Sequence, residues 1–195
     1  MDIVVASKNR GKLAEIEKLI SPSQGINFFS LGDFQDIPEI EETGKTFEEN
    51  ALIKAGIVSS HTGKISLADD SGLVIDALGG RPGVYSARYG GSGLNDTDRC
   101  RLILEEMKEF PSSRSARFIC VMALSVPGKV DFTSEGSVEG VIHTEMRGSG
   151  GFGYDPIFYI PELGKTMAEI PIEEKNRISH RAIALRKISE RLKSI

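Results

Sequence analysis

The stretch LADDSGLVIDALGG, Leu67–Gly80, places two adjacent carboxylates within an apolar run. The apolar residues are typical of a buried strand, but Asp69 and Asp70 interrupt them. Burying an isolated carboxylate is costly unless it is paired, protonated or bound to a metal. Because adjacent residues of a strand face opposite sides of a sheet, we expect a strand on each side of DDSG and a turn there that presents both side chains.

The N-terminal half outside this stretch is patterned as an α/β chain. A strand over residues 3–6 leads through a polar turn to a helix with apolar residues at helical spacing, for which Asn9 is the predicted N-cap. Thr46 and Glu49 form a T-x-x-E capping box, which predicts the start of a second helix. Strand, loop and helix in this order open an α/β unit.

The C-terminal half continues this pattern. The predicted elements are, in order, a glycine-rich loop over 79–93, a helix over 100–110, strands over 116–126 and 131–145, and a helix over 178–192. The length suits one large domain or two small lobes. We therefore predict a mixed α/β fold in a single domain over residues 1–195.

Composition and charge indicate an ordinary globular protein. The 195 residues are 39% hydrophobic and 27% charged, and the net charge of -4 gives no reason to expect general nucleic-acid binding. Cys100 and Cys120 form no C-x-x-C pattern, so we interpret them as reduced core thiols. Because no apolar run suits a signal peptide or a membrane span, we expect a soluble, cytoplasmic protein that binds no membrane.

A basic turn, SKNRGK, joins the first strand to the first helix. Backbone N–H groups and the positive dipole end at a helix N-terminus suit a phosphate group. The spacing is not that of a Walker A loop, and a basic turn that is plain solvated surface is the alternative interpretation. The turn consists of Ser7, Lys8, Asn9, Arg10, Gly11 and Lys12.

The hexapeptide GSGGFG, residues 148–153, matches the dinucleotide-binding pattern G-x-G-x-x-G letter for letter. That fingerprint requires a helix to start within it, and here Tyr154-Asp155-Pro156 follows, with Pro156 disfavouring helical geometry at Asp155. The kinase lysine and H-R-D motif are also missing. We therefore predict a flexible loop whose backbone approaches a planar ligand, and not a Rossmann or kinase site.

The carboxylates favour a magnesium site, with caps and turns as the alternative. Asp69 and Asp70 are adjacent, and Glu41 and Glu42 lie in an acidic segment that we expect nearby. Oxygen ligands without a Cys/His cluster suit Mg²⁺, which binds one or two protein carboxylates plus substrate phosphates. The three scattered histidines make no zinc motif. The sequence also lacks the G-x-S-x-G elbow that is typical of a serine hydrolase.

Four segments in order carry a resemblance to a known family: SKNRGK, EETGKTFEENALIKA, ADDSGLVIDALGGRPGVYSARY and GGFGYDPIF…EEKNRISHR. Over nearly the whole chain they resemble the inosine/xanthosine triphosphate pyrophosphatase (HAM1-like) family. The resemblance implies a long mixed central sheet with helices, two lobes flanking an active-site cleft, and a homodimer. It also implies Mg²⁺-dependent hydrolysis of noncanonical purine nucleoside triphosphates (ITP, dITP, XTP) to the monophosphate and pyrophosphate.

The resemblance assigns roles residue by residue. Ser7 to Lys12 match the triphosphate-binding loop, although many members have Thr-Gly-Asn where this chain has Ser7-Lys8-Asn9. Glu41 matches a metal ligand, and Asp70 matches the proton acceptor that also contacts the metal. The matching nucleotide-contacting positions are Ser71, Phe152, Gly153, Tyr154, Asp155, Lys175, His180 and Arg181.

The implied chemistry leaves two points open. Asp70 is a weak base unless its pKa is raised, for which Asp69 as a neighbouring like charge is one candidate; a metal that lowers the pKa of water is the other. Donors such as Arg181 suit the C6 oxygen of inosine and disfavour the C6 amino group of adenosine. Phe152 is either a stacking surface for the purine or a core anchor.

Two other functions compete with this interpretation. One is a pyrophosphatase for other nucleotides, such as modified pyrimidines, and the other is a sensor that binds a nucleotide without cleaving it. The paired acids argue against a sensor, because binding a triphosphate requires cations more than carboxylates.

Overall fold

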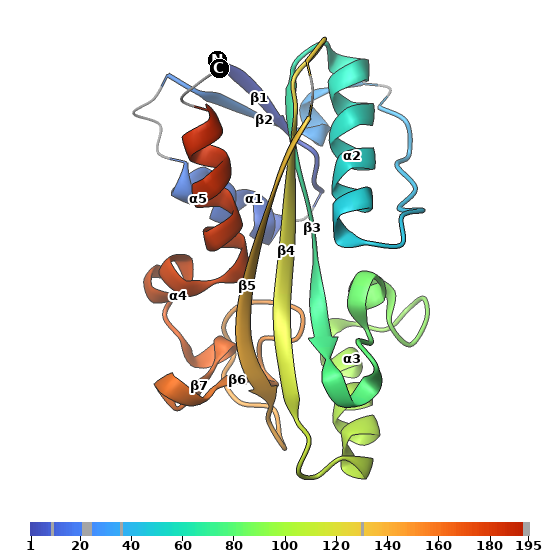
Figure 1. The fold of residues 1–195 in the computed structure, drawn as a ribbon, viewed down its shortest axis with the longest axis vertical. Helices are drawn as coiled ribbons and strands as arrows, with labels where there is room; N and C mark the ends of the chain where they lie inside the picture. The colour runs from blue at the N-terminus through green and yellow to red at the C-terminus, as the bar shows by residue number, and fades with distance from the viewer. Residues whose placement is uncertain (9, 21–24, 36, 130, 193–195) are drawn as a thin grey trace. The chain divides into compact units, whose positions relative to one another are not determined.

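The computed structural model describes residues 1–8, 10–20, 25–35, 37–129 and 131–192 (Figure 1). Among these residues, seven strands form one sheet in the order β2-β1-β3-β4-β5-β6-β7. The strands are β1 Asp2–Val5, β2 Asn27–Ser30, β3 Ile65–Ile75, β4 Ser115–Ser125, β5 Phe132–Ile142, β6 Phe158–Ile160 and β7 Lys165–Thr166. β1 pairs in parallel with β2 and β3, whereas β6 pairs antiparallel with β5 and β7, which confirms the predicted mixed sheet.

Helices alternate with strands from β1 to β4, whereas β4 to β7 follow one another without an α-helix between them and two helices close the chain. The helices are α1 Arg10–Leu19, α2 Phe47–Thr62, α3 Asp96–Glu106, α4 Ile172–Ile178 and α5 His180–Leu192. Short 3₁₀ turns include η3 Asp76–Leu78, η4 Gly83–Arg88 and η5 Met107–Glu109. None of the described helices is long and apolar enough to cross a membrane.

The chain divides into two compact units, each with its own core. Unit 1 comprises Met1–Asp70, Cys120–Gly136 and His180–Ile195, and unit 2 comprises Ser71–Ile119 and Ser137–Ser179. The unit 1 core joins β1, β3 and β4 to α1 and α5 through side chains such as Ile3, Ile16, Leu67, Met122 and Leu185. The unit 2 core includes Leu73, Ile103, Phe118, Tyr154 and Phe158.

The capping signals of the sequence are confirmed at α2. Thr46 Oγ1 accepts a hydrogen bond from the Glu49 backbone N–H at 3.1 Å, and Glu49 Oε2 accepts one from the Thr46 N–H at 3.3 Å. The helix ends at Gly63, which adopts a left-handed φ of 65° as a C-cap. The predicted N-cap of α1, Asn9, lies outside the described residues, and α1 begins directly after it at Arg10.

Two predicted boundaries are wrong. DDSG is not a turn between strands, because β3 runs without a break from Ile65 to Ile75 and carries both aspartates in its middle. The last helix does not include Ile178, since Ser179 adopts an extended conformation (φ -65°, ψ 150°) that separates α4 from α5. At DDSG the strand continues where the polar residues suggested a turn, and at Ser179 the backbone breaks the helix where the apolar pattern continues.

One glycine allows β5 to approach α5 closely in unit 1. A Cβ atom on Gly136 would overlap the His180 carbonyl oxygen and lie 2.6 Å from the Ala184 backbone nitrogen. Ser134 strengthens the same contact, because its hydroxyl donates to the Ala184 carbonyl at 2.9 Å. The start of α5 is therefore fixed against β5 by backbone contacts.

We expect Gly136→Ala to lower the free energy of unfolding by roughly 3 kcal/mol, because backbone atoms cannot yield as a flexible side chain would. Gly56→Ala is the matched control: it lies inside α2 with open space around it, so we expect a gain of about 0.5–1 kcal/mol. Urea unfolding monitored by circular dichroism measures both. Equal effects of the two substitutions would contradict the close approach.

Candidate active site

The continuous strand β3 directs Asp69 and Asp70 to opposite sides of the sheet. Neighbouring residues of a strand alternate between its faces. Asp69 contacts α1 and α5, while Asp70 contacts α2, and Figure 1 shows α2 on one side of β3 and α5 on the other. The Asp69 and Asp70 side chains are only 1% and 8% exposed, so both carboxylates require compensating partners.

Asp69 is compensated by two cations. Lys12 Nζ lies 2.9 Å from Asp69 Oδ2, and Arg181 Nε and Nη2 each donate to the same oxygen at 3.4 Å. Burial by itself would raise the pKa of Asp69, but the charges of Lys12, Arg181 and Lys54 hold the pKa of that carboxyl well below its usual range. Asp69 therefore remains ionised and is a poor candidate for a general base.

Asp70 has the opposite electrostatic character. Asn50 Nδ2 donates to Asp70 Oδ2 at 3.1 Å, and Lys54 Nζ lies 3.5 Å from Asp70 Oδ1. Burial raises the pKa of Asp70 above its ordinary value, Lys54 opposes that shift, and the negative charge of Glu42 adds to it. A raised pKa suits a carboxylate that accepts a proton near neutral pH.

The like charge beside Asp70 is Glu42, and not Asp69 as the sequence suggested. Glu42 Oε1 lies 2.7 Å from Lys54 Nζ, so one ammonium group bridges the two acids. Burial tends to lower the pKa of Lys54, but Asp70, Asp69 and Glu42 outweigh it and raise that pKa above its usual value. Lys54 therefore remains a cation between two carboxylates.

Sequence reasoning missed Asn50, Lys54 and the role of Glu42. Asn50 is fully buried and accepts from the Gly44 backbone N–H at 2.8 Å through Oδ1, which orients its Nδ2 toward Asp70. The available signal was spacing, because Asn50 and Lys54 are four residues apart on α2, beside the buried Ala51 and Ala55. Polar residues at helical spacing next to a buried stripe indicate a shared polar partner.

Glu41, the predicted metal ligand, is exposed. Its backbone carbonyl accepts from the Thr43 N–H at 3.1 Å, while the neighbouring Glu42 makes the ion pair with Lys54. Within the described part of the chain, no three His, Cys, Asp or Glu side chains converge as a metal-binding group. The donor chemistry still fits Mg²⁺, because the Asp70 and Glu42 carboxylates both lie beside one position, which the Lys54 ammonium occupies here. Mg²⁺ takes its remaining ligands from phosphate and water.

The basic turn leads into α1 as predicted. Ser7 is half-buried and its backbone N–H donates to the Val5 carbonyl at 2.8 Å, and Lys8 is exposed. Arg10 and Gly11 form the first turn of α1, and Lys12 in the same turn reaches Asp69. Asn9 lies outside the described residues. The turn therefore delivers one cation to the Asp69 carboxylate.

In unit 2, the predicted nucleotide loop is held by a buried ion pair. Asp155 Oδ2 accepts from Lys175 Nζ at 2.6 Å and from the Phe152 backbone N–H at 2.9 Å, and both charged side chains are 4% exposed. Lys175 Nζ also lies 4.8 Å from the centre of the Phe152 ring, a cation–π distance. Lys175 from α4 thus connects the acid and the aromatic ring of the loop.

The Ser86 backbone carbonyl in η4 and two side chains of α3 fix the rest of that loop. Tyr154 is buried and its hydroxyl donates to the Ser86 carbonyl at 2.8 Å. The Gly153 backbone N–H donates to Asp96 Oδ2 at 2.8 Å, and the Cys100 thiol donates to the Gly153 carbonyl at 3.4 Å. No helix starts within GSGGFG, all of whose residues the structure describes, which confirms the rejection of a dinucleotide fingerprint.

Ser71, His180 and Arg181 are the other predicted nucleotide-contacting residues. Ser71 is half-buried and follows Asp70 in β3. His180 opens α5 directly before Arg181, and the two are 7% and 1% exposed. Cys100 and Cys120 are free and buried, which confirms the predicted core thiols, and burial raises the pKa of each thiol to about 12.

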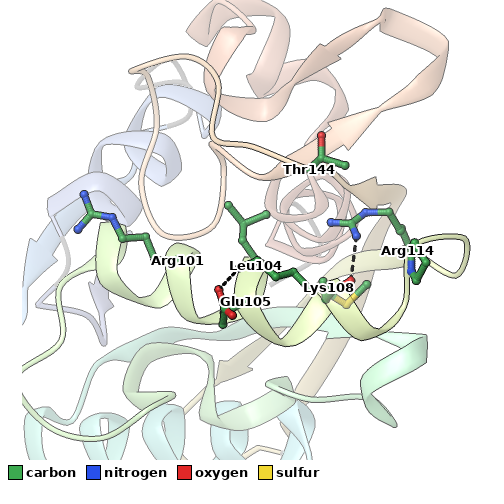
Figure 2. A pocket seen from close by; sticks show the side chains of 8 residues that line it. Arg101, Leu104, Glu105, Lys108, Arg114 and Thr144 are labelled. Atoms are coloured by element: carbon green, nitrogen blue, oxygen red, sulfur yellow. Dashed lines mark hydrogen bonds and ion pairs between the residues drawn. The ribbon is translucent and has the colours of Figure 1, made fainter.

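A cavity of about 540 Å³ in unit 2 is a poor candidate site (Figure 2). Its basic groups are already used: Lys108 pairs with Glu105 at 2.6 Å, Arg101 pairs with Asp98 at 3.2 Å, and Arg114 donates to three backbone carbonyls, those of Ile142, Met107 and His143. Figure 2 draws the Lys108–Glu105 pair and one of the Arg114 contacts as dashed lines. These pairings leave the cavity without a cation directed at a ligand.

Comparisons of sequence and of structure find similar proteins that match nearly the whole chain. A sequence model of the Ham1 family matches residues 3–191. Proteins named dITP/XTP pyrophosphatase from Bacillus licheniformis and Geobacillus kaustophilus are 52% and 50% identical, covering 96% and 100% of this chain and 96% and 95% of their own lengths. The structure of a HAM1 protein from Coxiella burnetii superposes with a TM-score of 0.92 at 45% identity, covering both chains completely. The Staphylococcus aureus Ham1 protein gives 0.90 at 39% identity, covering 100% of this chain and 99% of its own.

We expect Asp155→Asn to lower the free energy of unfolding by about 3 kcal/mol, because it leaves the buried Lys175 ammonium without its counter-charge. Glu145→Gln is the matched control in the same unit, since its pair with Arg147 is exposed and should contribute little to stability. Urea unfolding compares the two variants. A loss for Asp155→Asn no larger than that of the control would contradict a structural role of the buried pair.

Proposed function

Because the chain belongs to the Ham1 family, we propose that it hydrolyses noncanonical purine nucleoside triphosphates (ITP, dITP and XTP) to the monophosphate and pyrophosphate. The observation that carries this proposal is the full-length match to relatives named dITP/XTP pyrophosphatase. The buried carboxylate cluster of β3 supports a catalytic function, because a raised Asp70 pKa is unnecessary for binding alone.

The proposed reaction assigns the proton to Asp70. Water attacks the α-phosphorus, the bond from that phosphorus to the bridging oxygen breaks, and pyrophosphate leaves with that oxygen. Asp70 accepts the proton of the attacking water, for which its raised pKa suits it. Asn50 and Lys54 hold the two oxygens of Asp70 in place, so the base needs little reorganisation during the reaction.

We propose Mg²⁺ as the cofactor, with Asp70 and Glu41 as its protein ligands. A bound Mg²⁺ ion would neutralise charge that develops on the phosphate oxygens. Glu42 is the alternative second ligand, because its carboxylate already shares a cation with that of Asp70. The turn from Ser7 to Lys12 is proposed to bind the triphosphate through the N-terminus of α1.

We propose that hydrogen-bond donors and one aromatic ring recognise the purine base. Phe152 is proposed to stack on the purine, because Lys175 and Asp155 already hold its segment in place. Arg181 and His180 are proposed to donate to the C6 oxygen of inosine or xanthosine, which adenosine lacks. The homodimer and the cytoplasmic location implied by the resemblance belong to the same proposal.

The first test measures pyrophosphate release from ITP, dITP, XTP, ATP and dTTP with and without Mg²⁺. We expect Asp70→Asn to bind ITP by calorimetry but to lose about 10²–10⁴-fold in kcat, the range of general base catalysis. Asp2→Asn, an exposed carboxylate paired with Lys64, serves as the control and should retain activity. Near-normal turnover by Asp70→Asn would remove that residue from the mechanism, and preferred cleavage of dTTP would favour a pyrimidine enzyme.

A metal titration distinguishes the two glutamates. If Glu41 is the ligand, we expect Glu41→Gln to raise the Mg²⁺ concentration for half-maximal activity by about tenfold or more, the loss expected for a disrupted metal site. Glu42→Gln should leave that midpoint nearly unchanged and alter the apparent pKa of Asp70 instead. The reverse result would assign the second carboxylate to Glu42.

A further inference from the structure

We propose that Asp69 is a positioning residue that couples base discrimination to phosphate binding by holding Arg181 and Lys12 on one carboxylate oxygen. The inference deepens the proposed function and rests on it. Asp69 itself touches neither phosphate nor base in this proposal, and it acts through its two partners.

The geometry joins three elements of unit 1 at a single atom. Lys12 Nζ from α1 lies 2.9 Å from Asp69 Oδ2, and Arg181 Nε and Nη2 from α5 each lie 3.4 Å from that oxygen. The Asp69 and Arg181 side chains are both 1% exposed, while Lys12 is 18% exposed. The two cations thus share one buried counter-charge.

This sharing determines the orientation of the guanidinium group. Arg181 carries its donors on a rigid planar fork, so two contacts to one oxygen restrict the plane in which the remaining donors lie. The start of α5 is independently fixed by the close contact of Gly136 with the His180 carbonyl. Backbone and side chain of Arg181 are therefore both held, as selective recognition of a base oxygen requires.

The same sharing connects Arg181 to the phosphate-binding turn. Lys12 belongs to the first turn of α1, where the triphosphate is proposed to bind. Without Asp69, the Lys12 ammonium and the Arg181 guanidinium would lose the carboxylate that they share. Loss of this carboxylate should consequently disturb both partners, although they lie 169 positions apart in the chain.

Asp69→Asn tests the coupling by steady-state kinetics with ITP and ATP and by inhibition with inorganic tripolyphosphate. We expect the ITP-to-ATP ratio of kcat/KM to fall by about tenfold or more, and the tripolyphosphate inhibition constant to rise by at least about fivefold. Asp2→Asn, the control carboxylate on β1, should change neither quantity. An unchanged ratio in folded Asp69→Asn would overturn the proposal.

A double-mutant cycle separates positioning from a general loss of structure. If Asp69 acts through Arg181, the double variant Asp69→Asn/Arg181→Met should have the same ITP-to-ATP ratio as Arg181→Met alone. Multiplied losses would show that the two residues act independently, which overturns the coupling.

Lys12→Met keeps the proposal testable if Asp69→Asn does not fold, because Lys12 is the most exposed of the three. We expect this variant to weaken tripolyphosphate inhibition and also to change the ITP-to-ATP ratio several-fold; a changed inhibition with an unchanged ratio would refute the coupling. Wild-type protein that releases no pyrophosphate from ITP would instead refute the proposed function, so the two failures are distinguishable.

Discussion

Two carboxyl groups on consecutive residues of one buried strand are the constraint around which unit 1 is arranged. Neither Asp69 nor Asp70 is tolerable in that position without compensation, because each would be desolvated. The strand alternation sends them to opposite faces, so compensation must come from two directions: α1 and α5 supply cations to Asp69, and α2 supplies an amide and a cation to Asp70. The helices that cover the two faces of β3 are thus also the source of the charges that make its sequence foldable.

The different neighbours of Asp69 and Asp70 give these chemically identical side chains different pKa values. Asp69 contacts Lys12 and Arg181, which hold its pKa low, whereas Asp70 contacts Lys54, which it shares with Glu42, and burial raises its pKa. Pairs of titratable groups pushed apart in this way are the usual basis for dividing structural from proton-transfer roles within a site. Here the division follows from which face of the strand each residue occupies, and a slip of one residue in the register of β3 would exchange the two roles.

Much of the fold was predictable from local patterns, and the errors occurred where local patterns carry no information. The capping box at Thr46 and Glu49, the start of α1 within the basic segment and the mixed α/β class all follow from short-range chemistry. The continuous β3 did not, because its compensating charges come from residues as distant as Arg181, 112 positions away. The residue pattern alone did not show that Glu42, and not Glu41, contacts Lys54 beside Asp70. The family resemblance indicated the function. The contacts of the two aspartates explain why Asp70, and not Asp69, suits the role of general base.

The glycine-rich loop of unit 2 shows how a misleading motif arises from a real requirement for glycine. A Cβ atom on Gly148 would lie 2.5 Å from the Ala168 backbone, and one on Gly151 would overlap Asp155 Oδ2, while both residues have positive φ. These glycines are therefore needed for the loop to pack against its neighbours, and not for a pyrophosphate to approach a helix. With its backbone held by Asp96, Asp155 and the Ala168 carbonyl, the loop presents Phe152 in a conformation that is already ordered. If a planar ligand stacks on this ring, binding would cost the protein little conformational entropy, because the loop is already ordered. Such pre-ordering increases affinity.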